Sequence, residues 1–249
     1  MPKLSAGRGK TIISISIALG IGLFLLAAFL TGNLRRTQQG DRVKVVIGSR
    51  DAVYCSHGAT VADAKALGLA LRSAGYFDDT GAEASLSKGP GGAVVSFSAG
   101  GQWAGPDRVY AFEDLGRRIA PSVGGFPIKV RLTDAHGGVQ REITVGRLAV
   151  GAKDELYYFG SATKADAEAL AKALKDGRFF TDLGAKVFYS KESGKAITFV
   201  LNKNAWERPD FYAVFQDVVR RAAPSVGGLP IAMRMLDLDM QFQRETVIQ

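Results

Sequence analysis

Short apolar and β-branched stretches alternate with two longer amphipathic stretches in residues 44–146. Residues 44–48 and 52–56 have the composition of two strands joined by a turn. Residues 60–63, Thr-Val-Ala-Asp, form a capping box, in which the Thr hydroxyl accepts from a backbone N–H and the Asp reaches back. A helix is therefore expected from there to about Gly75. Its apolar stripe consists of Ala64, Leu67, Ala70 and Leu71.

A second strand pair, a second helix and a closing hairpin follow. Residues 82–89 and 92–100 are expected to be strands joined by a glycine-rich turn. Pro106 suits the first turn of a helix, where its missing N–H is not needed. Residues 127–145 complete the unit as a hairpin. The helix positions expected to face the core are Val109, Phe112, Leu115 (or Gly116) and Ile119.

The chain matches itself over this whole pattern. APSVGG occurs at 120–125 and again at 223–228, an offset of 223 − 120 = 103 residues. At this offset the units 44–146 and 147–249 account for every residue from 44 to 249, and the match needs no gap. A fixed long period indicates one structural unit used twice. We therefore expect two α+β repeats with these boundaries.

Each repeat has the element order β-β-α-β-β-α-β-β. Without its first and last strands this is the split βαβ, ferredoxin-like pattern, with both helices on one face of the sheet. The expected fold class is α+β: an N-terminal transmembrane helix followed by two tandem ferredoxin-like (split βαβ) sandwiches with extra edge strands. Residues 139–151 run from one repeat into the next without a linker. The repeats are therefore expected to share or abut sheet edges as one rigid body, and a single saddle built from both halves is the alternative.

The repeated APSVGG segment has two interpretations. As a joint, its proline ends a helix or begins a short extra turn through Val123, its glycines allow a left-handed reversal, and Pro127 starts a strand. As an anion site, the glycine N–H groups would act with nearby arginines. Ion pairs with carboxylates such as Asp114, Asp134 and Glu142 explain the arginines more simply. The arginines concerned are Arg117, Arg118 and Arg131, with Arg220, Arg221 and Arg234 in the second repeat.

Two tryptophans and two lysines occupy matching positions in the repeats. Trp103 and Trp206 each precede a helix start, where they fit a hydrophobic staple. A surface aromatic contact with glycan or protein is the alternative. Lys88 and Lys191 are expected to be solvated residues at hairpin tips.

The sequence contains no pattern typical of a metal, cofactor or catalytic site. Cys55 is the only cysteine and fits a small core residue on a strand. His57 and His136 have no counterparts at the matching positions and lack the spacing of zinc ligands. Phosphate-binding and dinucleotide-binding fingerprints are missing as well. We expect no cofactor, no metal and no catalytic residues.

Residues 11–34 carry no charge and separate Lys10 from Arg35. As a helix they would span about 36 Å, longer than the roughly 30 Å hydrocarbon core of a bilayer. They are expected to form a single-pass transmembrane helix between an N-terminal tail, residues 1–10, and a basic linker, residues 35–43. A cleavable signal peptide would have a shorter apolar stretch and an A-x-A-like exit, so a signal-anchor is favoured.

Small residues on one face of the 11–34 segment would allow two copies to pair as a homodimer through it. The positive charges flank this segment almost evenly, so the orientation rule decides little. Because a lone anchor with a short head often leaves the bulk outside, the protein is expected in the cell membrane with extracytoplasmic domains.

The net charge of +8 is concentrated near this segment. Residues 1–50 hold eight cations and one anion, so 24 basic and 23 acidic residues remain in the other 199. A nearly neutral remainder argues against nucleic acid as a partner.

These observations favour a membrane-anchored tandem module with a non-catalytic binding or scaffolding role. Its expected partners are the lipid bilayer, through residues 11–34, and a protein. Recognition of cell-envelope glycan is one alternative, which rests on analogy of fold. An enzyme with a site between the two repeats is the other, and it would need a cleft there with carboxylates at its walls.

Overall fold

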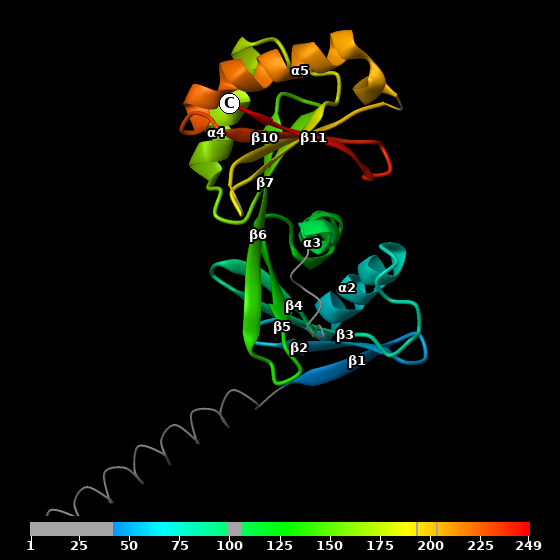
Figure 1. Cartoon of the computed structure of the whole chain (residues 1–249). Coiled ribbons are helices and arrows are strands. Elements are labelled where there is room, and N and C mark those ends of the chain that lie inside the picture. The colour runs from blue at the N-terminus through cyan, green and yellow to red at the C-terminus, as the bar shows by residue number, and fades with distance from the viewer. Residues whose placement is uncertain (1–41, 99–105, 193, 203) are drawn as a thin grey trace, which may run out of the picture. The chain divides into compact units, whose positions relative to one another are not determined.

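Eleven strands form one continuous mixed sheet in the computed structural model of the protein, in the order β1 to β11 along the chain (Figure 1). Four neighbouring pairs are parallel and six are antiparallel. Val43–Gln249 form one compact unit. The residues that the structure describes are 42–98, 106–192, 194–202 and 204–249.

The first half of the sheet contains two helix connections. Its elements are β1 (Val43–Ile47), β2 (Asp51–Ser56), α2 (Val61–Ser73), β3 (Glu83–Gly89), β4 (Gly92–Ser98), α3 (Pro106–Ile119), the short 3₁₀ helix η1 (Ala120–Val123), β5 (Ile128–Thr133) and β6 (Val139–Val150).

The second half repeats this order. Its elements are β7 (Asp154–Phe159), α4 (Lys164–Asp176), β8 (Lys186–Ser190), β9 (Ala196–Val200), η2 (Ala205–Glu207), α5 (Pro209–Ala222), η3 (Ala223–Val226), β10 (Ile231–Leu236) and β11 (Phe242–Ile248).

The expected fold class, two tandem ferredoxin-like sandwiches, is wrong. In a split βαβ unit, a helix joins two strands that have another strand between them. Here each helix connection joins two parallel strands that are direct neighbours, β2 with β3 and β4 with β5, and again β7 with β8 and β9 with β10. Both arrangements have the same element order, so the pattern of strands and helices does not distinguish them.

Strand β6 makes the two halves into one sheet. Its residues from Val139 to Val145 pair with β5, and those from Val145 to Val150 pair with β7. The boundary expected between residues 146 and 147 therefore falls inside a strand, and β6 runs from the first group of strands into the second (Figure 1). The two halves thus share one sheet through β6.

The expectation that the two repeats correspond residue by residue at a constant offset of 103 is also wrong. Leu86 on β3 pairs with Val95 on β4, whereas the matching Tyr189 on β8 pairs with Ile197 on β9. Because 189 − 86 = 103 but 197 − 95 = 102, the β8–β9 hairpin is one residue shorter. The structural counterpart of Ser96 is therefore Thr198, as their pairing with the two matching arginines on β5 and β10 shows.

A buried aspartate holds the loop after the first helix of each half. The Asp51 carboxylate accepts hydrogen bonds from the N–H groups of Asp79, Gly81 and Ala82 at 2.8–2.9 Å. Asp154 accepts three at 2.7–2.8 Å in the second half. Burial raises the pKa of Asp51, but the N–H donors outweigh it and leave the pKa below its usual value.

The predicted capping boxes are present, and the hairpin lysines are part of them. Asp63 and Asp166 close the boxes at the N-termini of α2 and α4. Each also pairs with a lysine, Lys88 at 2.7 Å and Lys191 at 2.8 Å. These hydrogen bonds are the main reason why the pKa of each aspartate is lowered to about 2. The expectation that both lysines are solvated turn residues is therefore wrong.

The helices cover one face of the sheet in each half, and among the described residues only the second half is covered on both faces. Tyr157, Phe159 and Phe188 point away from α4 and α5 and pack into the core of the first half. Helix α3 lies between the two groups of strands and supplies this cover (Figure 1). The first half has serines where two of these rings stand, Ser56 and Ser85, which are half-buried.

Within the described part of the chain, no helix combines the length and apolar character needed to cross a membrane. The segment expected to do so, residues 11–34, lies outside it.

Candidate functional site

Arg117 and Arg118 in the last turn of α3 bind groups of their own half. Arg117 donates to Oδ1 of Asp114 through Nη2 at 2.7 Å and Nε at 3.1 Å. Arg118 donates to the carbonyl oxygens of Ser73 and Ala74 at 3.0 and 3.3 Å. The Arg118 contacts tie the end of α3 to the end of α2.

The other predicted arginines are distributed over β5, α5 and β10. Arg131 donates to Glu142 at 2.6 Å, and its counterpart Arg234 pairs with Glu245. Arg221 pairs with Asp217, and Arg220 is exposed. Three of the six, Arg117, Arg118 and Arg234, line the same cleft, which is described below.

The geometry of APSVGG fits the joint interpretation. The expected extra turn is η1, and Gly124 follows it with a φ of 112°. The N–H groups of Gly124 and Gly125 both donate to the carbonyl of Ala120, so the donors that an anion would need are used within the segment. In the second half, Lys195 donates to the carbonyls of Gly227 and Gly228.

Trp206 lies in η2 and is half-buried against the core of the second half. Its carbonyl oxygen accepts from Arg244 at 3.3 Å. Trp103 lies outside the described residues.

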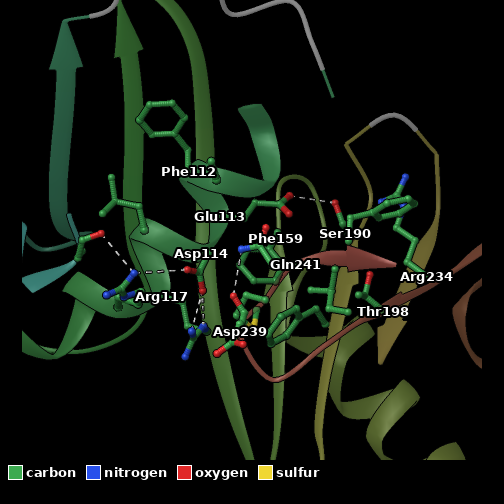
Figure 2. Close-up of a pocket in the computed structure, with 18 of the residues that line it drawn as sticks. Phe112, Glu113, Asp114, Arg117, Phe159, Ser190, Thr198, Arg234, Asp239 and Gln241 are labelled. Atoms are coloured by element: carbon green, nitrogen blue, oxygen red, sulfur yellow. Dashed lines mark hydrogen bonds and ion pairs between the residues drawn. The ribbon is translucent and has the colours of Figure 1, made fainter. Parts of the chain in front are cut away.

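A cleft of about 740 Å³ lies between α3 and the sheet of the second half (Figure 2). Helix α3 can lie close to β5 and β6 because a Cβ atom at Gly116 would come within 2.9 Å of Val130 and 2.8 Å of Val145. One wall of the cleft is α3, and residues after the end of α2 lie beside it. Strands β7 to β10 and the β10–β11 turn form the other wall.

Aromatic rings form much of the lining. Phe112 and Leu115 come from α3, and Phe159 and Phe188 come from the facing sheet. The Arg117 guanidinium lies 6.0 Å from the ring centre of Phe188 and 5.6 Å from that of the neighbouring Tyr157. A cation at this distance over an aromatic face is attracted to the ring.

Glu113 on α3 is the buried carboxylate of the cleft, with 6% of its surface exposed. Its Oε1 atom accepts a hydrogen bond from Ser190 on β8 at 3.4 Å, drawn dashed in Figure 2. Within the described chain this is its only hydrogen bond. Burial raises the pKa of Glu113 to about 7, Glu192 adds to this, and Arg234, Ser190 and Arg141 oppose it.

The charges around Glu113 are paired with one another. Arg141 binds Glu192 at 2.8 Å, and Arg234 binds Glu245. With Glu113, this group contains three carboxylates and two guanidiniums. Within this group Glu113 is the carboxylate without an ion pair of its own, and burial is the main cause of its raised pKa.

Glu113 does not belong to the repeated architecture, because Gln216 stands at the matching position of α5. A charge that only one copy carries, in a buried place, indicates a role specific to the cleft. Sequence reasoning missed it, although the difference between the aligned residues is a readable signal.

The sequences of the strands that form the cleft wall also carry a signal that this face is covered. Residues 156–159, Leu-Tyr-Tyr-Phe, and 187–189, Val-Phe-Tyr, are continuous apolar runs, whereas residues 84–86, Ala-Ser-Leu, which match 187–189, alternate. Continuous apolar runs are typical of strands buried on both faces. They therefore indicate that something covers the outer face of the second half.

Polar groups in the cleft can bind a ligand by hydrogen bonding and charge. Ser190, Thr198 and Gln241 offer donors and acceptors beside Glu113 (Figure 2). Over the ranges that the structure describes, no group of His, Cys, Asp and Glu side chains is arranged to hold a metal ion.

In comparisons with protein-family models, with curated proteins and with solved structures, nothing matches this chain.

Proposed function

We propose that residues 43–249 form a non-catalytic binding module whose cleft receives a segment of a protein partner. The observation that carries the proposal is a cleft lined by aromatic residues, with exposed apolar side chains at two nearby positions. Phe242 lines the cleft and is 52% exposed, and Leu238, next to the lining residue Asp239, is 66% exposed. A partner that inserted a side chain into the cleft would cover both.

The composition of the site supports a protein partner. Aromatic residues and arginine, which form the wall around Phe188 and Arg117, are enriched at the energetic centres of protein interfaces. The volume of about 740 Å³ has room for one or two side chains of a partner.

The test compares a filled cleft with a matched control. Thr198→Trp places a large ring at the cleft wall, and Ser96→Trp makes the same change at the structural counterpart on the first half. A protein that the native chain and S96W retain from extracts, and that T198W loses, would support the proposal. Equal retention by all three would contradict it.

An enzyme is the second candidate, because Glu113 and Ser190 meet in a cleft between the halves. A carboxylate with a pKa of about 7 is suited to general acid or base catalysis near neutral pH. The backbone N–H of Glu192 also donates to the Ser190 hydroxyl, at 3.4 Å. Covalent labelling of Ser190 by a fluorophosphonate would favour this candidate.

Other expectations stay predictions from the sequence. They are recognition of glycan, association with a membrane through residues 11–34, pairing of two chains there, and an extracytoplasmic location. For glycan, an exposed tryptophan on an open sheet face was the favourable sign, and Trp206 is half-buried in η2 instead.

A further inference from the structure

The cleft has one buried carboxylate that its surroundings do not neutralise. Glu113 is 6% exposed, and Ser190 gives it a single hydrogen bond of 3.4 Å. Isolated ionised groups are costly to bury, so a buried charge is normally paired. Glu113 is thus held in a place where a cation would be stabilised.

The cations that line the cleft already have partners. Arg117 binds Asp114, Arg118 binds Asp114 and two backbone carbonyls, and Arg234 binds Glu245. The neighbouring Arg141 binds Glu192. Because the described cations of the cleft have these partners, we consider the ligand as the source of a cation that pairs directly with Glu113.

The other lining residues indicate which kind of side chain would carry this cation. Phe159 on β7 and Phe188 on β8 offer apolar contacts in the cleft, on the wall that faces Glu113. Ser190 and Thr198 add polar oxygens. An aliphatic stem with a charged end fits this combination, because such side chains bury the stem on apolar surface while the charged end is hydrogen-bonded.

We propose that the cleft selects a lysine or arginine side chain of the partner, which lies between the aromatic walls and pairs with Glu113. This inference rests on the proposed function and names the residue that the partner segment inserts.

The first experiment selects peptides from a randomised library on the full chain, purified with a mild detergent present. We expect enrichment of a basic residue next to apolar ones, and binding that Thr198→Trp abolishes and Ser96→Trp preserves. Peptides that depend on the cleft but lack a basic residue would overturn this inference and leave the proposed function standing. Failure to enrich any cleft-dependent peptide would overturn both.

The second experiment changes only the ligand, so the protein remains native. A selected arginine peptide is compared with its citrulline analogue, which keeps the shape and loses the charge. We expect affinity to fall about tenfold or more with citrulline. In Glu113→Gln the two peptides should bind alike, and Glu168→Gln, an exposed change on α4, should keep the difference. Equal affinities for the native protein would overturn the inference.

Affinity for the arginine peptide should also rise between about pH 5.5 and about pH 8, since Glu113 must ionise to pair with it. The other charges facing Glu113 are Glu192, Arg234 and Arg141. A pH response that persists in Glu113→Gln would show that one of these groups, and not Glu113, holds the peptide, and would overturn the inference.

Discussion

Glu113 on α3 and Ser190 on β8 are joined by a hydrogen bond of 3.4 Å although 77 residues separate them along the chain. The bond connects a helix of the first half to a strand of the second. It also lies in the cleft, so the contact that joins the halves is part of the candidate site.

Replacing Glu113 by Gln should stabilise the protein more as pH rises. The pKa of Glu113 is about 7 in the folded state and 4.5 as a free side chain. A raised pKa stabilises the fold fully below pH 4.5, and this contribution is lost as pH rises through 7. Relative to native protein, E113Q should gain up to about 3 kcal/mol at pH 8. Urea unfolding from about pH 4.5 to about pH 8 measures this, and parallel curves for the two proteins would contradict it.

Replacing Asp51 or Asp154 by Asn should lower the melting temperature. Asn keeps one acceptor oxygen but turns an N–H donor toward the N–H of Asp79 or Asp182. Each change should lower the melting temperature by about 5 °C, measured by circular dichroism. Asp78→Asn, an exposed change in the same loop, is the control.

The lowered pKa of both buried aspartates predicts a pH dependence of stability that comes from the same hydrogen bonds to the loop. It stabilises the fold above pH 3.8, and the contribution is lost as pH falls below that value. The Asn variants should therefore show less acid sensitivity than native protein. Equal melting temperatures across native, test and control proteins would rule out the proposed role of the loop contacts.

Lys88→Met should raise the pKa of Asp63 from about 2 toward 3.8. The lysine hydrogen bond is the largest cause of the shift, and the partly exposed pair should contribute about 1 kcal/mol. This contribution is present above pH 3.8 and is lost as pH falls through about 2. NMR titration of Asp63 measures the pKa, and Lys65→Met on the exposed side of α2 should leave it unchanged. A pKa that stays near 2 in K88M would show that the capping box alone causes the shift.

Phe188→Ser should destabilise the contact between the halves. Serine is the residue at the matching position of the first half, Ser85. The change also removes an aromatic ring that α3 covers. We expect a loss of about 3 to 4 kcal/mol in the free energy of unfolding, as for other buried phenylalanines. Ser85→Ala on the open face should cost little. A loss below about 1 kcal/mol for F188S would mean that α3 does not pack firmly on this wall.

The features that the sequence predicted correctly depend on few adjacent residues. The capping boxes at Thr60 and Thr163, the short turn through Val123 and the left-handed Gly124 are each determined within about six positions. Cys55 is buried on β2, as expected for a core residue.

The order of the strands depends on long-range pairing and was predicted wrongly. Both a split βαβ unit and the observed sheet bury the same helix stripe, such as Leu67 and Leu71, on the same kind of sheet face. Periodicity reports which side of an element is buried, and it does not identify the neighbouring strand. The one-residue difference between the hairpins was hidden because the offset returns to 103 by Arg234.

The cleft escaped prediction for a related reason. Glu113 lies beside the apolar stripe of α3, where a carboxylate ordinarily faces water. It is buried because strands of the second half of the sheet lie against that face of the helix. Arg117 was found among the candidates only through its place beside APSVGG, and its contact with Tyr157 could not be read from the sequence.

Strand β6 makes separation of the halves unfavourable. If the chain were cut at Gly146, each fragment would end in a strand with one row of backbone N–H and C=O groups left open. Such fragments would tend to recruit another copy to that edge or aggregate through it.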